Sequence, residues 1–208
     1  MTERETLLER DRRDGETRKL LGGGARSVVR LSARMPASMR ERGLSEEPVR
    51  RGAAAFENAC RDLRLGLIAR GSGGGALGPW RLWSSGSKPA ELKRAALLIE
   101  EGSWLGQLLD IDVADAEGPF GRSALCMPPR PCVVCGGPAA VCAGRASHAA
   151  AAVEAAFAVM LGTLSGFGLP PGARSPGRVE SGSPGGSAVG AYPSSTIREI
   201  AYQGGDTP

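Results

Sequence analysis

The sequence predicts one α+β domain in which a mixed or antiparallel sheet is flanked by helices. Segments with apolar residues at three- and four-residue spacing, typical of helices, are interspersed with short apolar runs typical of strands. The 208 residues are enough for one ordinary hydrophobic core. Because aromatic residues make up only 4% of the chain, that core must consist largely of Leu, Val, Ile and Ala.

The N-terminal half of the chain contains two predicted helices and two or three predicted strands. Thr2 to Leu21 has caps, charges and leucines at helical spacing, and a triple glycine follows it. Ser27 to Ser32 alternates apolar and polar residues, as a strand does. A second helix is predicted from Pro48 to Leu63 and a further strand from Leu65 to Ala69, whereas Pro79 to Trp83 fits a strand or a loop. The buried stripe expected on the second helix consists of Ala53, Phe56, Cys60 and Leu63.

The C-terminal half adds a helix from Pro89 to Glu101, with Pro as the first helical residue. A strand follows from Leu108 to Val113, and an alanine-rich helix beyond His148 is expected to pack on the sheet. One side of the first of these helices carries Leu92, Ala95, Ala96 and Ile99, and the last helix carries Val153, Phe157 and Met160.

Two parts of unequal order are expected along the chain. Residues 1–165 are predicted to form one folded domain. Residues 166–208 are rich in Gly, Pro and Ser and bury too little apolar surface to offset the entropy of ordering. We expect this C-terminal tail to be largely disordered.

The most informative motif is Asp110-Ile111-Asp112, because it places two carboxylates in a run that otherwise has the pattern of a buried strand. Alternate residues of a strand share a face, so both aspartates should project together, away from the core. Clustered carboxylates with open coordination positions suit Mg²⁺ that carries substrate phosphates. The alternative is that both acids simply solvate the exposed face of an edge strand.

A second motif combines three cysteines with the only histidine of the chain: Cys132, Cys135, Cys142 and His148. This set and the Cys-x-x-Cys spacing match the ligands of a structural Cys₃His zinc site. The alternatives are that the thiols are small buried hydrophobes and that His148 is a loop residue, a helix cap or a phosphate contact. Cys60 and Cys126 lie outside the pattern.

Charge and cysteine use limit the functional classes. The formal charge of +4 is too small for a dedicated nucleic-acid binder, but it favours a polyphosphate substrate or an acidic protein partner. Five cysteines in a chain without a signal peptide predict reduced thiols and a cytoplasmic location. No stretch approaches the ~18 apolar residues that a membrane span requires, so membrane association is not expected.

These motifs occur in an order that resembles a known family. The run from Leu105 to His148, with its Asp-Ile-Asp-Val, Pro-Pro-Arg-x-Cys-x-x-Cys and Ala-Val-Cys-Ala segments, is similar to the apo-citrate lyase phosphoribosyl-dephospho-CoA transferases. Weaker similarity extends from Leu7 to about Met160 and includes an N-terminal Arg-Asp-x-Arg segment. The resemblance implies a nucleotidyltransferase-like fold, with residues 1–165 as the catalytic domain.

The resemblance also implies a reaction. The donor would be 2'-(5''-triphosphoribosyl)-3'-dephospho-CoA, the acceptor a serine of the apo acyl carrier subunit of citrate lyase, and pyrophosphate the leaving group. Asp110 and Asp112 would be catalytic and hold Mg²⁺, and one of them or a nearby side chain would take the serine proton. The residues expected to bind the substrate are Arg10, Arg13, Arg122, Arg130 and His148.

Two other functions remain open at this level. The nearer one is the equivalent holo-acyl carrier protein synthase of malonate decarboxylase, which would use the same donor and metal chemistry on another carrier. The more distant one is a non-enzymatic, zinc-stabilised binding module that places its arginines on nucleic acid. Such a module needs stacking aromatics or a continuous basic face, and the sequence indicates neither.

Overall fold

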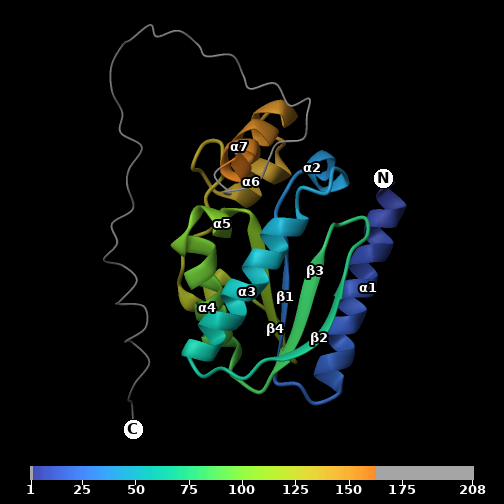
Figure 1. The fold of residues 1–208 in the computed structure, drawn as a ribbon, viewed down its shortest axis with the longest axis vertical. Helices are drawn as coiled ribbons and strands as arrows, with labels where there is room; N and C mark the ends of the chain where they lie inside the picture. Colours follow the sequence, from blue (N-terminus) through green and yellow to red (C-terminus); the bar gives the residue numbers. More distant parts are fainter. Residues whose placement is uncertain (1, 163–208) are drawn as a thin grey trace, which may run out of the picture. The chain divides into compact units, whose positions relative to one another are not determined.

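A computed structural model describes residues 2–162, which are built around one antiparallel sheet. Its five strands lie in the order β2-β3-β1-β4-β5 (Figure 1), and each pair of neighbours is antiparallel. The predicted α+β class is therefore confirmed, and the sheet is antiparallel throughout. The strands are β1 (Ser27–Ala33), β2 (Ile68–Gly73), β3 (Trp80–Ser85), β4 (Leu109–Asp115) and β5 (Gly118–Phe120). The helices are α1 (Glu3–Gly22), α2 (Ala37–Glu41), α3 (Glu46–Asp62), α4 (Pro89–Gly102), α5 (Trp104–Gln107), α6 (Ala139–Gly144) and α7 (Ala150–Gly162), with a 3₁₀ turn at Arg122–Leu125.

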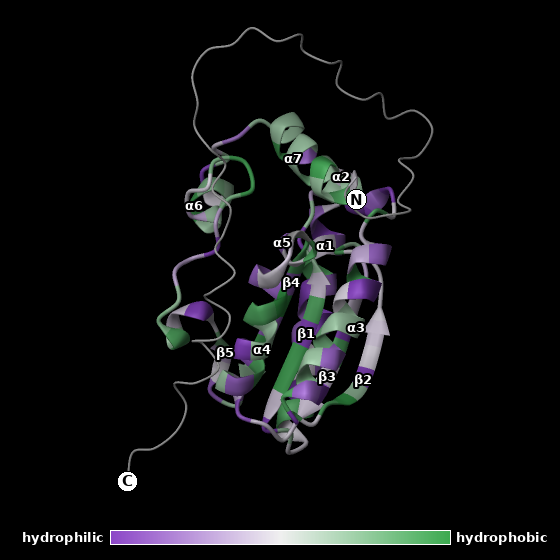
Figure 2. Cartoon of the chain, turned by 60° about the vertical axis from the view of Figure 1, so that its left-hand side comes forward, coloured by the Kyte–Doolittle hydropathy of each residue, from purple (hydrophilic) through white to green (hydrophobic). Residues whose placement is uncertain are grey.

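The main core lies between the sheet and helices α3 and α4. Val29, Leu31 and Ile111 point to this side and are fully buried. Phe56 of α3 packs on Trp83 of β3, with ring centroids 5.5 Å apart. Figure 2 shows the apolar residues concentrated along β1, β4 and the inner side of α4.

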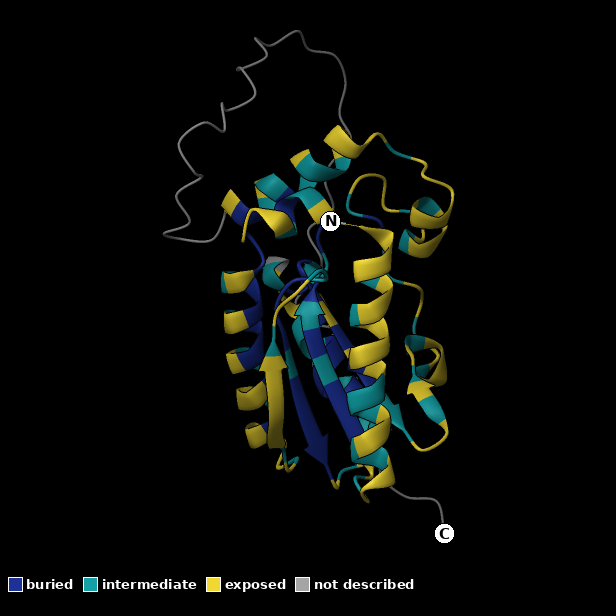
Figure 3. Cartoon of the chain, turned by 90° about the vertical axis from the view of Figure 1, so that its right-hand side faces the viewer, coloured by how far each residue is buried: buried dark blue, intermediate teal, exposed yellow. Residues whose placement is uncertain are grey.

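Helix α1 covers part of the opposite face of the sheet (Figure 3). A capping box between Thr2 and Glu5 begins the helix. Near its C-terminal end, Leu20 and Leu21 pack against the buried Val28, Trp80 and Leu82. The rest of this sheet face carries polar side chains. Helix α1 therefore covers a surface that is partly apolar and partly charged.

Most long elements lie where the sequence predicts them, but two interpretations need correction. Leu63 was expected in the buried stripe of α3, yet it follows the last helical residue and is 44% exposed. The strand predicted from Leu65 to Ala69 is instead β2 and extends through glycines to Gly73. These glycines leave room for the side chain of Trp80 in β3. A Cβ on Gly73 would lie only 2.9 Å from the indole nitrogen of Trp80.

The last helix also differs from expectation. It begins after His148, as predicted, and Phe157 is buried. However, α7 lies beyond the strand ends beside α2 (Figure 1), where the Ser38 hydroxyl donates to Glu154, and does not pack on a sheet face. The predicted tail of residues 166–208 lies outside the described residues. No described helix is long and apolar enough to cross a lipid bilayer.

Candidate active site

The two aspartates of β4 lie on the sheet face that carries α1. Along this strand Leu109, Ile111 and Val113 are at most 2% exposed and enter the core. The side chains of Asp110 and Asp112 are 53% and 52% exposed on the other side. The alternation predicted from the sequence therefore holds, and it directs both carboxylates toward one region of the surface.

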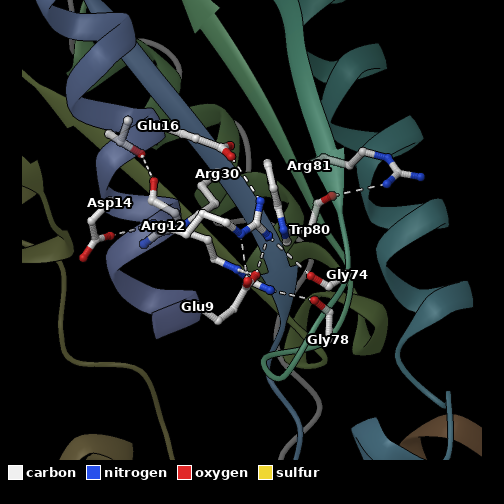
Figure 4. Close-up of polar contacts among 11 residues, drawn as sticks. Glu9, Arg12, Asp14, Glu16, Arg30, Gly74, Gly78, Trp80 and Arg81 are labelled. Carbon is white, nitrogen blue, oxygen red and sulfur yellow. Dashed lines mark hydrogen bonds and ion pairs between the residues drawn. The ribbon is translucent and has the colours of Figure 1, made fainter. Parts of the chain in front are cut away.

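The neighbouring strand β1 places an arginine beside this pair. Ser32 lies opposite Asp110 and Arg30 lies opposite Asp112 in the antiparallel register. The Arg30 guanidinium lies 3.3 Å from Asp112 and donates at 2.9 Å to Asp14 of α1 (Figure 4). Burial disfavours the charge on Arg30, but its two acidic partners outweigh that effect and raise its pKa. Arg30 therefore links α1, β1 and β4 at the aspartate pair.

The aspartate pair is only partly neutralised by Arg30. Asp112 lines a recess, so half of its side chain meets solvent while protein surrounds the rest. This surrounding protein and the charge of Asp110 raise the pKa of Asp112, despite the opposing effects of Arg30 and Lys93. Repulsion between two neighbouring carboxylates is what a divalent cation relieves. The chemistry of the pair therefore fits a hard metal ion.

The recess is a cavity of about 260 Å³ between α1, α2 and the sheet. Its lining combines both signs of charge. The cationic residues are Arg10, Arg13, Arg30 and Arg40, and the acidic ones are Asp14, Asp110 and Asp112. Carboxylates that can hold a metal and guanidinium groups that can hold phosphate oxygens thus share one cavity.

Two arginines predicted from the sequence line this cavity in different states. Arg10 is exposed on α1. Arg13 is only 5% exposed, and its guanidinium donates to Glu9 at 2.7 Å and to the Gly78 carbonyl at 2.6 Å. It also lies over the Trp80 ring at 5.7 Å. Arg13 therefore attaches α1 to the β2–β3 hairpin while it contributes charge to the cavity.

A larger cavity of about 710 Å³ adjoins the first one along α1, β4 and β5. Asp14, Arg30 and Asp112 line both cavities, so the two meet at this ion-pair cluster. The larger cavity adds one cation, Arg18, and a mainly aliphatic lining that includes Leu21, Val28, Val113 and Pro119. Together the cavities can accept a ligand with a charged end and a longer, less polar body.

A buried ionic cluster around Glu100 lies against the edge of β4 that faces away from β1. Strand β5 pairs only with residues 113–115 of β4, which leaves the edge at residues 109–111 without a strand partner. Glu100, 2% exposed, accepts from the Ile111 backbone amide at 2.9 Å, and Lys93 donates to the Ile111 carbonyl at 2.7 Å. Side chains thus replace the missing strand and fix the backbone between the two aspartates.

Arg122 and Arg130 both join this cluster. Arg130 lies 3.0 Å from Glu100 and donates at 2.6 Å to the Leu109 carbonyl. The same guanidinium lies 3.9 Å from the Asp110 carboxylate. Arg122 lies 3.6 Å from Glu100 and also pairs with Glu101. Arg130 thus reaches the edge of the aspartate site, whereas Arg122 serves the cluster behind it.

Arg34, directly after β1, supplies another cation near Asp110. Its amide donates to the Leu108 carbonyl at 2.8 Å. Its Nη1 atom is buried and has no hydrogen-bond partner among the described residues. Burial, and then the nearby charge of Arg130, lower the pKa of Arg34. Arg34 does not line the small cavity, so it acts on Asp110 through its charge and not through a contact in the cavity.

The three cysteines and the histidine of the second motif also come together. One ligand atom from each of Cys132, Cys135, Cys142 and His148 lies within 4.8 Å of all the others. Burial opposes ionisation of Cys132, but backbone amides of Val134 and Cys135 and the adjacent thiols lower its pKa to about 6. The hydrogen bond with Cys135, burial and Cys132 raise the pKa of Cys142 to about 11.

Comparison with known proteins gives the family. Residues 2–163 match the model of the apo-citrate lyase phosphoribosyl-dephospho-CoA transferases. The chain belongs to this family of enzymes. A transferase of that name from Escherichia coli O1:K1 is 27% identical over 145 residues, which are 69% of this chain and 79% of the relative. Its counterpart from Escherichia coli O139:H28 (strain E24377A / ETEC) is 39% identical over 74 residues, 35% of this chain and 40% of the relative.

In this member of the transferase family, the structure divides the predicted site residues into three groups. Asp110, Asp112, Arg10 and Arg13 line the small cavity, and Arg130 lies at its edge. Arg122 lies in the Glu100 cluster. His148 belongs to the cysteine cluster. The predicted substrate-binding set is therefore not one contiguous surface.

Several residues of the site were missed from the sequence alone. Arg30 and Ser32 fall on the polar face of the predicted strand, but nothing in the sequence pairs that strand with the aspartates. Arg34 and Arg40 resemble ordinary surface arginines in a chain with 26 Lys and Arg residues. Glu100 resembles a solvated residue near a helix end, because its burial depends on how short β5 is.

Proposed function

We propose that this family member transfers the phosphoribosyl-dephospho-CoA group from 2'-(5''-triphosphoribosyl)-3'-dephospho-CoA to a serine of the apo acyl carrier subunit of citrate lyase. The serine oxygen forms a bond to the phosphorus next to the ribose, and the bond to pyrophosphate breaks. The serine proton leaves to a base. The observation that carries the proposal is the repelling Asp110–Asp112 pair in a cavity that four arginines also line.

The metal in this proposal is Mg²⁺, with Asp110 and Asp112 as its protein ligands. Two carboxylates leave coordination positions for phosphate oxygens, which is how magnesium sites for polyphosphates are built. A bound Mg²⁺ would neutralise charge on the triphosphate and on the departing pyrophosphate. The raised pKa of Asp112, caused first by the surrounding protein and then by the charge of Asp110, supports this assignment, because a bound cation would stabilise the ionised carboxylate.

The arginines bind and orient the donor. Arg10 and Arg40 supply charge from α1 and α2 to the small cavity, where the triphosphate would lie. Arg34 and Arg130 supply positive charge at the Asp110 end. Such fixed cations stabilise the charge that accumulates during phosphoryl transfer.

The larger cavity suits the dephospho-CoA part of the donor. It meets the small cavity at Asp14, Arg30 and Asp112, so one extended molecule can occupy both.

The base that takes the serine proton is one of the carboxylates that line the small cavity. These are Asp14, Asp110 and Asp112.

The test measures the mass of the apo carrier after incubation with the full-length protein, the donor and Mg²⁺. We expect the carrier to gain one phosphoribosyl-dephospho-CoA group and pyrophosphate to appear in equal amount. Asp110→Asn and Asp112→Asn should each lower the rate at least ~100-fold, the scale of losing one preorganised electrostatic contact. Asp62→Asn, at the exposed end of α3, is the matched control and should keep full activity.

A parallel reaction with the apo carrier of malonate decarboxylase separates the two carriers. Modification of the citrate lyase carrier at the higher kcat/KM supports the proposal. Modification of the malonate decarboxylase carrier alone would assign the same chemistry to the other partner. Full activity in both aspartate variants would refute the proposed metal site.

A further inference from the structure

The segment between β5 and α7 has almost no hydrophobic core. Of residues 121–149, all of which the structure describes, only Cys132 is buried. A segment that buries so little apolar surface does not keep one conformation by packing alone and needs a cross-link or a metal. Figure 2 shows this stretch, with α6, lying to one side of the sheet.

The four potential ligands lie close enough together to share one zinc ion. Their ligand atoms lie within 4.8 Å of one another, and the sulfurs of Cys135 and Cys142 are 3.6 Å apart. Zn–S bonds of about 2.3 Å in a tetrahedron place two sulfurs ~3.8 Å apart. A disulfide would need its sulfurs at about 2.05 Å, so the thiols are spaced for a shared ion and not for a bond to each other.

The backbone around the first two cysteines supports the same interpretation. A tight turn closes from Cys132 to Gly137, with the Cys132 amide donating to the Gly137 carbonyl at 2.6 Å. Gly136 has φ +75°, which other residues rarely adopt. This turn carries Cys132 and Cys135 on one loop with the Cys-x-x-Cys spacing of metal-binding sites.

The histidine provides an independent observation. The Nε2 atom of His148 is buried and has no hydrogen-bond partner among residues 2–162. A buried ring nitrogen without a partner costs free energy unless something else satisfies it. A metal beside three cysteine sulfurs would satisfy this histidine.

We propose that Cys132, Cys135, Cys142 and His148 bind one Zn²⁺, and that this ion is structural. Four protein ligands complete a tetrahedral shell and leave no position for substrate, as in structural zinc sites. Three sulfur ligands select zinc over magnesium or calcium. The site is separate from the aspartate pair, and its existence does not depend on the transfer reaction.

A zinc ion here would act on the aspartate site through Arg130. Arg130 lies two residues before Cys132, and its carbonyl accepts from the Ala139 amide at 2.9 Å at the start of α6. Its side chain holds the Leu109 carbonyl and lies 3.9 Å from Asp110. Zinc would therefore fix the loop that presents Arg130 to β4, which makes the four ligands positioning residues for that arginine.

The test measures zinc in untagged full-length protein purified without chelators from zinc-supplemented cells. Elemental mass spectrometry should find about one zinc per chain. Replacement of zinc by Co²⁺ should give the visible absorption of tetrahedral cobalt bound to thiolates. Cys135→Ser and His148→Ala should lower the zinc content at least ~10-fold. Cys126→Ser, at an exposed thiol outside the cluster, and the Asp110→Asn/Asp112→Asn double variant should keep it.

Hydrogen exchange of the same samples gives a second readout besides metal content. Removal of zinc should abolish protection in residues 121–149 and leave β1, β3 and β4 protected, which shows that the sheet is still folded. Wild-type protein that contains no zinc and binds no Co²⁺ would overturn the proposal. So would a Cys135→Ser variant with as much zinc as Cys126→Ser, or a Cys135–Cys142 disulfide in wild-type protein as purified.

Discussion

At the scale of single residues, the position of the aspartate pair depends on Glu100 behind it. Glu100 holds the Ile111 amide and lies within 4.0 Å of three cations. Those cations are Lys93, Arg122 and Arg130. Without a carboxylate at this position, Lys93 would lose this ion pair inside the protein, and Arg122 and Arg130 would keep only Glu101 and the more distant Asp110 as acidic partners.

Glu100→Gln should therefore lower the free energy of unfolding by about 3–5 kcal/mol, the usual cost of breaking a buried ion pair. Urea unfolding of wild type and the variant measures this change in free energy. The neighbouring Glu101→Gln is the control, because Glu101 is 39% exposed and its pair with Arg122 should contribute less than about 1 kcal/mol. Equal losses in the two variants would show that Glu100 is not the centre of the cluster.

Only some contacts of single residues could be predicted from the sequence. The shared face of Asp110 and Asp112 was predictable, because strand alternation depends only on local geometry. The roles of Arg30 and Arg34 were not, because they arise from pairing β1 with β4 and from burial at the end of β1. Arg122 and Arg130 were both expected at the aspartate site, but both contact Glu100 and only Arg130 also approaches Asp110.

At the scale of elements, Glu9, Arg12 and Arg13 form one of the attachments of α1 to the sheet. Glu9 pairs with both arginines at 2.7–2.8 Å, and both guanidiniums lie over the Trp80 ring (Figure 4). Burial favours the neutral form of Glu9, but hydrogen bonds from Arg12 and Arg13 outweigh it and lower the pKa of Glu9 below 4.5. This helix carries Arg10 and Asp14 into the cavity.

The attachment of α1 should therefore depend on pH. Because the pKa of Glu9 is lower in the folded state, its contribution is complete above pH 4.5 and is lost as the pH falls through the folded value. Wild type should exceed Glu9→Gln in urea stability by about 1–2 kcal/mol at pH 6, and the difference should shrink below pH 4.5. The control variant Glu3→Gln, at an exposed position of the same helix, should match wild type in urea stability at pH 6. A constant difference between pH 6 and pH 3.5 would contradict this account.

A close contact between α4 and α5 positions the start of β4. A Cβ on Gly106 would lie 2.1 Å from the Ile99 carbonyl oxygen, and this backbone cannot give way as a side chain could. Gly106→Ala should cost at least ~2 kcal/mol in urea unfolding. Gly15→Ala, which meets nothing within 4 Å in the middle of α1, should stabilise by about 0.5–1 kcal/mol. A stable Gly106→Ala variant would show that the contact can relax.

The predictability of an element followed its length and periodicity. Helices α3 and α4 were located within one or two residues because each repeats its apolar pattern over several turns. Helix α1 was located equally well from the capping residue at its start and the glycines after its end. The short α2, α5 and β5 have too few residues to show a period. Strand β2 was misplaced because glycine has little strand propensity, and its pairing depends on Trp80 filling the space above Gly71 and Gly73.

At the scale of the whole molecule, one face of the sheet stabilises the fold and the other carries the proposed active site. The apolar face packs on α3 and α4, whereas the polar face, under α1, holds the aspartates and the two cavities. The antiparallel order places β1 between β3 and β4, so Arg30 lies in the middle of the site. The class of this sheet was predictable from the sequence, but its strand order was not.

The most direct test of the proposed function is the mass of the apo carrier after reaction with wild-type protein and with Asp110→Asn. With donor and Mg²⁺, wild type should add one phosphoribosyl-dephospho-CoA group to the carrier, and a chelator should stop the reaction. The Asp110→Asn variant, with unchanged circular dichroism, should leave the carrier unmodified over the same time. An unmodified carrier with wild-type protein, or equal modification by both proteins, would contradict the account.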